Sequence, residues 1–398
     1  MFHMREPLTV RRDHKWVAAN PEETAMIIDG HAYLFESLDN ACGYADSAEH
    51  LKWCQAAYAH HHQPCFRLSD RHHFGDAKVL APNDATPLQA LPDKNFRFDK
   101  AEGRFLWEHQ GETYTKYFLP PNLRGGEYTP ASLISEMDHC DIDVAFIHTD
   151  PMLVRDSGFL AECIAQYPDR LRCMAPVDEW RLIDDCDSVI KELETAINVH
   201  GLHAIKFIPL MYMRSDEPWD DGAYRPFWEA ATQLGVPVFF TLGCGAVKNT
   251  DNPSREQLQR GYLDEHRILM RWMQRYPQMI CGLTHGFPWR LFLEGEEVVL
   301  PDEIWEPFAN PNCAIEICFP VRIGDLFDFP YREVWPALAA MVEKIGSNQL
   351  FWGTDMPFQN RFCTYRQSRV WIEKYCDFLT DNDRENIMGG TLQRILGL

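Results

Sequence analysis

Short apolar segments recur along the chain, most of them about 30 residues apart and separated by segments with helical periodicity. Each is four to eight residues long, and most are rich in Val, Ile and Phe, as buried strands are. The segments are MIID (26–29), VAFIHT (144–149), RCMAPVD (172–178), AIKFIP (204–209), PVFFTLG (237–243), MICGLTH (279–285), CAIEICF (313–319) and LFWGTDMP (350–357). Alternating strands and helices predict a parallel α/β fold, and eight such strands predict a closed (β/α)8 TIM barrel.

One interval breaks this rhythm, because the segment between the first two predicted strands is far longer than a loop. It contains a predicted helix, AEHLKWCQAAYAHHHQP, and a predicted hairpin, FRFDKAEGRFLWEHQGETYTKYF. We interpret residues 34–130 as a cap inserted over the mouth of the barrel. Residues 1–398 would then form a single domain.

Polar residues gather at or near the carboxyl ends of the predicted strands, where barrel enzymes place their active sites. These residues are His31, His148, Asp178, Glu179, Lys206, Thr241, His285, Glu316 and Asp355. We expect their side chains to converge, and this set is more informative than any single member of it.

Composition limits the partners and the compartment. The formal net charge of −21 argues against nucleic acids and anionic membranes as partners. No apolar run approaches the roughly 20 residues of a membrane span, and the basic N-terminal segment is not followed by the apolar stretch of a signal peptide. The 13 cysteines are scattered without a CxxC pair, so we expect reduced thiols in a cytoplasmic protein.

Several longer blocks carry a family resemblance. In chain order they are MDHCDIDVAFIHTD, FLAECIAQYPDRLRCMAPV, WEAATQLGVPVFF, LTHGF, LFWGTDMPF and ENIMGGTLQRILGL. Together they resemble the amidohydrolase superfamily, in particular the branch of aminocarboxymuconate-semialdehyde decarboxylase and the resorcylate decarboxylases. The resemblance covers most of the chain outside the insertion, and it implies a metal-dependent TIM-barrel enzyme. Dimers are common in this family.

The resemblance also implies metal ligands. The family's first-strand motif matches Asp29 and His31, its sixth-strand histidine matches His285, and its eighth-strand aspartate matches Asp355. Two positions differ, because the second histidine of the first-strand motif is Tyr33 and the fifth-strand histidine is Thr241. A zinc site of the usual kind would therefore lack two imidazole ligands.

Other residues of the predicted barrel mouth can replace the missing imidazoles. Glu179 and Glu316 follow or lie in strands, and among the insertion histidines 60 to 62 we favour His61 and His62. The predicted metal ligands are therefore His31, His61, His62, Glu179, His285, Glu316 and Asp355. Alternatively, Glu316 forms a salt bridge inside the barrel, because an unpaired buried carboxylate is costly, and Glu179 caps the next helix.

This mixed nitrogen and oxygen set is typical of sites that hold two irons. The chain resembles a small non-haem diiron monooxygenase offshoot of the amidohydrolase fold. The resemblance implies two Fe ions and O₂-dependent hydroxylation of a small organic or aromatic acid. A ferredoxin-type partner would supply electrons, since the chain has no flavin or nicotinamide fingerprint.

Two alternatives remain open at this point. One is a decarboxylase or hydrolase with a single zinc or manganese ion, in which Asp355 is a ligand or base beside metal-bound water. The other is a non-catalytic member that has lost its metal.

Tyr33, His148 and Lys206 are the candidate catalytic residues. Tyr33 could be a phenolate ligand, donate a hydrogen bond to bound oxygen or only pack, and we favour the last two. His148 would lie behind the ligands or at the substrate. Lys206 could be carboxylated and bridge two metals, as in related binuclear hydrolases, or pair with an acid inside the barrel.

Overall fold

The computed structural model describes residues 25–73, 77–82, 86–209, 217–245, 250 and 252–398, and the backbone of two further strands. These two are β1 (Thr9–Arg12) and β2 (Lys15–Ala18), which pair antiparallel. Each of the 13 cysteines lies within the described ranges as a free thiol.

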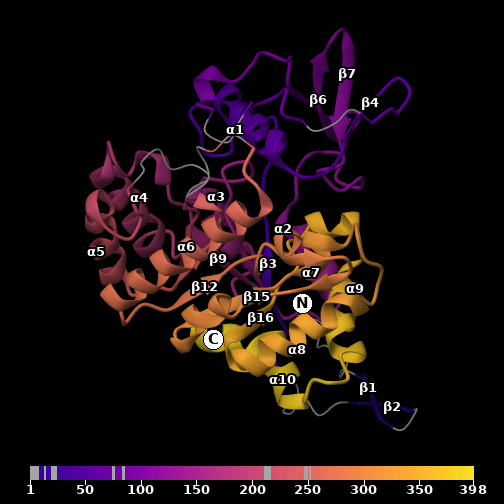
Figure 1. The fold of residues 1–398 in the computed structure, drawn as a ribbon, viewed down its shortest axis with the longest axis vertical. Helices are drawn as coiled ribbons and strands as arrows, with labels where there is room; N and C mark the ends of the chain where they lie inside the picture. The colour runs from indigo at the N-terminus through magenta and orange to yellow at the C-terminus, as the bar shows by residue number, and fades with distance from the viewer. Residues whose placement is uncertain are drawn as a thin grey trace.

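Eight parallel strands form the centre of the molecule, in the chain order that the sequence predicts (Figure 1). They are β3 (Ile28–Ala32), β8 (Val144–Ile147), β9 (Leu171–Ala175), β10 (Ala204–Phe207), β11 (Val238–Phe240), β12 (Cys281–Leu283), β15 (Cys313–Ile317) and β16 (Leu350–Trp352). The last residue of β3, Ala32, forms a parallel bridge with Met356 beyond β16, and the Asp355 amide donates to the His31 carbonyl at 2.8 Å. The predicted (β/α)8 barrel is confirmed.

Helices surround the strands and connect them in the way that parallel neighbours require. They are α2 (Pro130–His139), α3 (Ser157–Gln166), α4 (Cys186–Asn198), α5 (Arg225–Leu234), α6 (Arg255–Arg275), α7 (Phe319–Ile323), α8 (Trp335–Lys344), α9 (Tyr365–Val370), α10 (Asp381–Glu385) and α11 (Thr391–Leu396). Among the described residues, no helix combines the length and apolar character needed to cross a bilayer.

Strand alternation explains how an apolar barrel can carry a polar mouth. In β15, the outward residues Cys313, Ile315 and Ile317 join the large core against the helices, whereas Ala314 faces the barrel interior with Glu316 two residues further on. Inward positions nearer the amino ends of the strands hold apolar residues, and the ring centroids of Phe146 and Phe239 lie 4.9 Å apart there. Two residues further along, in or just beyond β8, β10, β11, β12 and β15, the inward positions are His148, Lys206, Thr241, Thr284 and Glu316.

The long segment after β3 forms its own small sheet, at the top of Figure 1. It contains α1 (Ser47–His60), β4 (Cys65–Arg67), β5 (Arg97–Asp99), β6 (Arg104–His109) and β7 (Glu112–Lys116), and the antiparallel strand order is β4-β7-β6-β5. The ammonium of Lys116 donates to the carbonyls of Tyr58 and His61 and so fixes the end of α1. The short strands β13 (Leu293–Glu294) and β14 (Glu297–Val298) form a separate pair.

Candidate metal centre

His31, His285 and Asp355 bring one ligand atom each to a common point at the carboxyl ends of β3, β12 and β16. The Oδ1 atom of Asp355 lies 3.2 Å from Nε2 of His31 and 3.5 Å from Nε2 of His285. All three atoms lie within 4.8 Å of one another. Two imidazole nitrogens and one carboxylate oxygen are ligands that zinc and other divalent transition metals accept.

The backbone at two of these residues is unusual. His285 has φ +66° and Asp355 has φ +65°, so both adopt the left-handed conformation directly beyond a strand. Non-glycine residues seldom adopt this conformation, and it tends to persist at functional sites where the surroundings hold it. It turns the chain sharply at the point where these two side chains meet His31.

The hydrogen bonds of His31 fix which ring nitrogen carries its proton. Nδ1 lies 2.9 and 3.1 Å from the two carboxylate oxygens of Glu316, which can only accept, so Nδ1 donates. In the neutral ring, Nε2 then presents its lone pair to the Tyr33 hydroxyl at 2.9 Å and to Asp355. Two electron-rich atoms 3.2 Å apart need a proton or a cation between them.

Glu316 itself is fully buried, and Oε2, the carboxylate oxygen 2.9 Å from His31 Nδ1, also accepts a hydrogen bond of 2.6 Å from the backbone amide of His285. Burial alone would raise the pKa of Glu316, but the charge and hydrogen bonds of His31 and His285 outweigh it and lower the pKa. Glu316 also forms a second group of potential ligands, with His31 and Cys318. Cys318 was not among the residues predicted from the sequence.

A second polar network lies directly behind His31. The His148 ring stacks on the His31 ring with centroids 3.5 Å apart, and its Nε2–H donates to the Gly30 carbonyl at 2.8 Å. Its Nδ1 therefore accepts from the ammonium of Lys206 at 3.3 Å. Lys206 also donates to Thr284 at 2.9 Å, and burial lowers the pKa of Lys206 to about 8.

Thr241, at the family's fifth-strand histidine position, belongs to the same network. Its hydroxyl lies 2.6 Å from that of Thr284. Tyr33, at the other substituted position, is buried against Phe358 with ring centroids 5.7 Å apart. The Tyr33 hydroxyl therefore lies beside the proposed ligand His31, whereas the Thr241 hydroxyl contacts Thr284.

Asp29 and Glu179 lie outside both groups of potential ligands found among the described residues. Asp29 accepts hydrogen bonds from the hydroxyls of Thr354 and Tyr365, at 2.6 and 2.5 Å. Glu179 begins a short 3₁₀ turn after β9 and accepts from the Ile208 amide at 2.7 Å. Burial raises the pKa of Glu179 to about 8.

His61 and His62 also lie outside these two groups. The His61 ring packs edge-on against Phe118 with centroids 4.3 Å apart, and burial lowers its pKa well below the usual value. His62 Nε2 lies 3.1 Å from a guanidinium nitrogen of Arg290. That Glu179, His61 and His62 bind metal stays a prediction.

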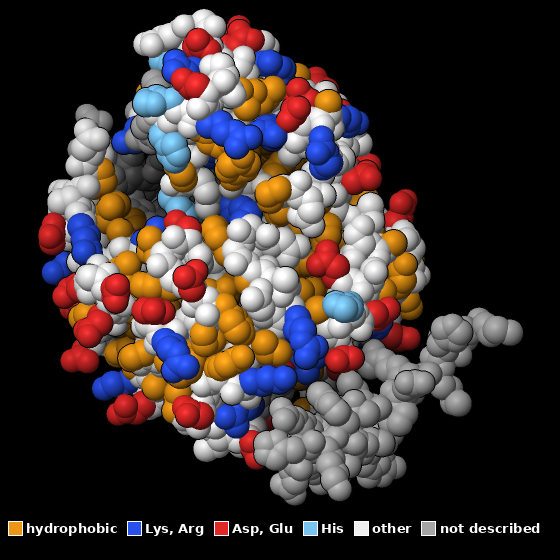
Figure 2. Space-filling view, turned by 90° about the vertical axis from the view of Figure 1, so that its right-hand side faces the viewer, with side chains coloured by type: hydrophobic (Ala, Val, Ile, Leu, Met, Phe, Trp, Pro, Cys, Tyr) orange, Lys and Arg blue, Asp and Glu red, His pale blue; other side chains and the backbone are white. Residues whose placement is uncertain are grey.

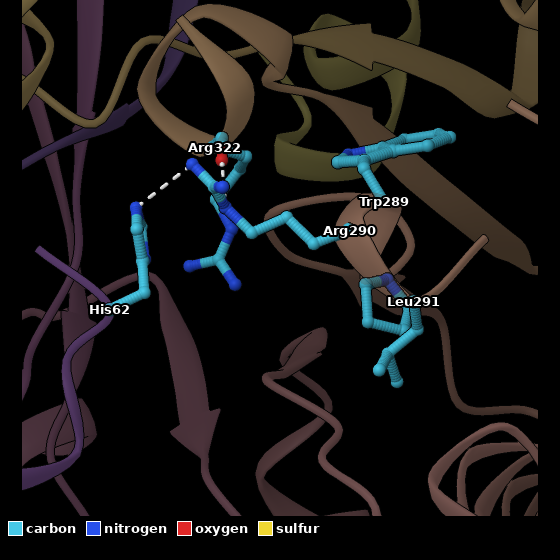
Figure 3. Close-up of a pocket in the computed structure, with 6 residues that line it drawn as sticks. His62, Trp289, Arg290, Leu291 and Arg322 are labelled. Atoms are coloured by element: carbon cyan, nitrogen blue, oxygen red, sulfur yellow. Dashed lines mark hydrogen bonds between the residues drawn. The ribbon is translucent and has the colours of Figure 1, made fainter. Parts of the chain in front are cut away.

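His62 and Arg290 line a cavity of about 190 Å³, together with Pro288, Trp289, Leu291 and Arg322 (Figure 3). The cavity lies next to the metal group, because its lining residue Trp289 donates from Nε1 to the carbonyl of the proposed ligand His285 at 3.2 Å. In the space-filling view, histidine side chains lie beside a hollow at the upper left of the face shown (Figure 2).

The arginines near this cavity were missed in the sequence analysis. Arg322 lies in α7 and Arg290 in the turn after β12, so neither follows a strand directly. Arg361 lies 5.5 Å from the Phe118 ring centre and 5.9 Å from that of Phe358, and burial lowers its pKa to about 10. Arginine is most often a surface residue, so the sequence carries little signal for these three.

The comparisons with known proteins agree with this architecture. The amidohydrolase family model matches residues 28–398, so the chain belongs to the amidohydrolase family. A search of curated proteins found no match.

Solved structures of low sequence identity share the fold. A probable 2-pyrone-4,6-dicarboxylic acid hydrolase from Acinetobacter baumannii is 16% identical, with a TM-score of 0.51 over 68% of this chain and 90% of that chain. The 5-carboxyvanillate decarboxylase from Sphingomonas paucimobilis is 17% identical, with a TM-score of 0.50 over 70% and 86%. A 2,6-dihydroxybenzoate decarboxylase is 18% identical, with a TM-score of 0.50 over 71% and 94%.

The chain is therefore an enzyme of the amidohydrolase superfamily, with side chains at the barrel mouth that can hold a metal ion.

Proposed function

We propose that this protein is a hydrolase or decarboxylase with a single divalent metal ion, and that it acts on a small organic anion. One observation carries the proposal: three potential ligand atoms, Nε2 of His31, Nε2 of His285 and Oδ1 of Asp355, lie within 4.8 Å of one another. This arrangement favours a cation at their centre. Three protein ligands also leave coordination positions free for water and substrate, as in catalytic zinc sites.

A bound divalent ion would act as a Lewis acid and would lower the pKa of a water molecule. The chain's own residues would bind the substrate and stabilise the charge that develops during the reaction. The guanidinium groups of Arg290 and Arg322 would bind the anionic group of the substrate, and the Trp289 ring would form an apolar wall. Lys206 would keep positive charge in the barrel mouth, where negative charge develops during either reaction.

The named relatives support this class of reaction, since one is a probable hydrolase and two are decarboxylases of aromatic acids. Both reactions suit an anionic, ring-sized substrate in a cavity lined by arginines.

The proposal can be tested by metal content and reconstitution. Protein purified without chelator should contain about one zinc or manganese ion per chain, as expected of a mononuclear catalytic site. Stripped protein should lose activity on aromatic carboxylates, measured as CO₂ release, or on cyclic esters, and should regain it with the ion.

The ligand assignment can be tested with His31→Ala and His285→Ala. Each should lose most of the bound metal and activity, because an imidazole ligand is removed. His139→Ala is the matched control, since His139 is an exposed residue at the end of α2. Full metal content in both ligand variants would refute this assignment.

A diiron monooxygenase is the second candidate. The observation in its favour is the second group of potential ligands, His31, Glu316 and Cys318, which shares His31 with the first. This enzyme would need two Fe ions and a ferredoxin-type electron donor. Two irons per chain with an absorption band that bleaches on reduction would favour it over the single-ion enzyme.

A further inference from the structure

Glu316 contacts two of the three proposed ligands at the same time. Its carboxylate accepts from Nδ1–H of His31 at 2.9 Å and from the backbone N–H of His285 at 2.6 Å. Its side chain is fully buried and comes from β15, whereas the ligands come from β3 and from the end of β12. One carboxylate thus links three elements of the barrel.

The surrounding backbone leaves space for this carboxylate. A Cβ atom at Gly353, just beyond β16, would lie 2.2 Å from Oε1 of Glu316. A Cβ atom at Gly286 would lie 2.9 Å from the Glu316 carbonyl oxygen and 2.5 Å from the Trp289 ring. A side chain at either glycine would therefore clash with Glu316, and glycine at both positions lets Glu316 lie close to His31 and His285.

The two hydrogen bonds have different consequences for metal binding. The bond to Nδ1 holds the His31 ring with its Nε2 lone pair toward Asp355 and makes that nitrogen a better electron donor. The bond to the amide helps to hold His285 in its left-handed conformation, φ +66°, which is unfavourable by itself. The same carboxylate therefore orients both imidazoles.

We propose that Glu316 is a positioning residue that holds His31 and His285 in the geometry that binds the metal, and that it does not bind the metal itself. This inference rests on the proposed single-ion function. An ion bound between Glu316, His31 Nδ1 and Cys318 would require the Nδ1 proton to leave, and it would compete with the His285 amide for the carboxylate.

The test is the metal affinity of Glu316→Gln, measured with Zn²⁺ by competition against a chromophoric chelator. Both hydrogen bonds end on Oε2 of Glu316, whereas Oε1 lies 3.1 Å from Nδ1 of His31. If the glutamine oxygen replaces Oε2, its NH₂ group replaces Oε1 and faces the Nδ1–H donor of His31. We expect one zinc per chain, as in the wild type, with a dissociation constant 10- to 100-fold higher, the range typical of lost partners of metal ligands. Cobalt-substituted protein should show an altered visible spectrum.

Two variants complete the design. Glu265→Gln is the matched control, because Glu265 is also buried and hydrogen-bonded, to Trp219 at 2.8 Å, but lies on α6. It should bind zinc like the wild type. Glu316→Asp keeps the charge but shortens the side chain, so it should also weaken zinc binding. Circular dichroism of the metal-free protein shows whether each variant folds. If Glu316→Gln does not fold, the zinc affinity of Glu316→Asp tests the inference.

The outcomes are distinguishable. Unchanged zinc affinity in the folded Glu316 variants would overturn this inference, while the proposed function would stand. Loss of one of two bound ions in Glu316→Gln would overturn it too, in favour of Glu316 as a ligand. Wild-type protein that binds no divalent metal would refute the proposed function itself.

Discussion

His31 has more partners than any other residue of the metal group. One ring nitrogen donates to Glu316, the other faces Tyr33 and Asp355, and one ring face stacks on His148. Each partner comes from a different part of the chain except Tyr33, two residues away. The sequence identifies His31 through its motif, but the contact with Glu316 requires β3 and β15 to lie in one barrel.

Glu179 shows the opposite case, a predicted ligand whose surroundings make its charged form unfavourable. The raised pKa of about 8 means that the folded protein holds the Glu179 proton more tightly than the unfolded chain does. The free energy of unfolding therefore falls as pH rises from about 4.5 to about 8. Glutamine at this position carries no charge and can still accept from the Ile208 amide.

We expect Glu179→Gln to be more stable than the wild type at pH 8, by on the order of 2–4 kcal/mol. The difference should disappear below about pH 4.5, where the carboxyl group is protonated in both states. Urea unfolding of metal-free protein at several pH values measures this. A variant less stable than the wild type at pH 8 would mean that the Glu179 carboxylate has a favourable cationic partner.

At the level of single elements, the alternation of the strands places the polar residues. Inward positions two residues apart change from apolar to polar along β8, β10, β11 and β15, so that Phe146 precedes His148 and Ala204 precedes Lys206. This pattern is visible in the sequence because its period is two. The strands, their order and most residues at their ends were therefore predictable.

The turns after the strands were not predictable in the same way. Glu179 follows its strand, but the 3₁₀ turn at Glu179–Arg181 directs its carboxylate to the Ile208 amide. Asp29 lies within β3, where the register shifts between Asp29 and Ala32, and it bonds to Thr354 and Tyr365 instead of joining the metal group. Neither a bulge nor a turn of this kind has a period that a sequence can reveal.

Gly282 in β12 provides a test of packing inside the barrel. A Cβ atom there would lie 2.6 Å from two carbons of the Phe239 ring, in the apolar layer below the metal group. We expect Gly282→Ala to destabilise the protein by about 1–3 kcal/mol, because the extra methyl group forces the ring to move. Gly125→Ala is the control, since Gly125 is exposed and its nearest contact would be 3.6 Å away. Equal unfolding midpoints for the two variants in urea would contradict this account of β12.

At the scale of the whole molecule, the net charge of the chain and the charge of the cavity lining have opposite signs. The chain carries a formal net charge of −21, whereas the cavity beside the metal group is lined by Arg290 and Arg322. The anionic substrate that we propose would therefore be repelled by the net charge of the chain and attracted at this cavity. Such an arrangement concentrates substrate at the site in a way that depends on ionic strength.

We expect Arg322→Met to raise KM for an anionic substrate about tenfold or more, since hydrogen bonds to charged groups contribute roughly 1.5–3 kcal/mol. The metal content should not change, because Arg322 lies outside both ligand groups. Steady-state kinetics at low and high salt measures both effects, with Arg225→Met as control, an exposed arginine on α5. A KM equal to that of the wild type would remove Arg322 from the binding site.

The left-handed backbone at His285 and Asp355 also limits how this centre can be redesigned. Besides glycine, Asn, Asp and His enter that conformation more readily than other residues, whereas β-branched and bulky side chains are strongly disfavoured there. An engineer who wishes to change the preferred ion could exchange Asp, Asn and His at these two positions at small backbone cost. A change to a less tolerant ligand such as Glu would add strain at the same site, so a new donor atom is better introduced at position 31, 33 or 241.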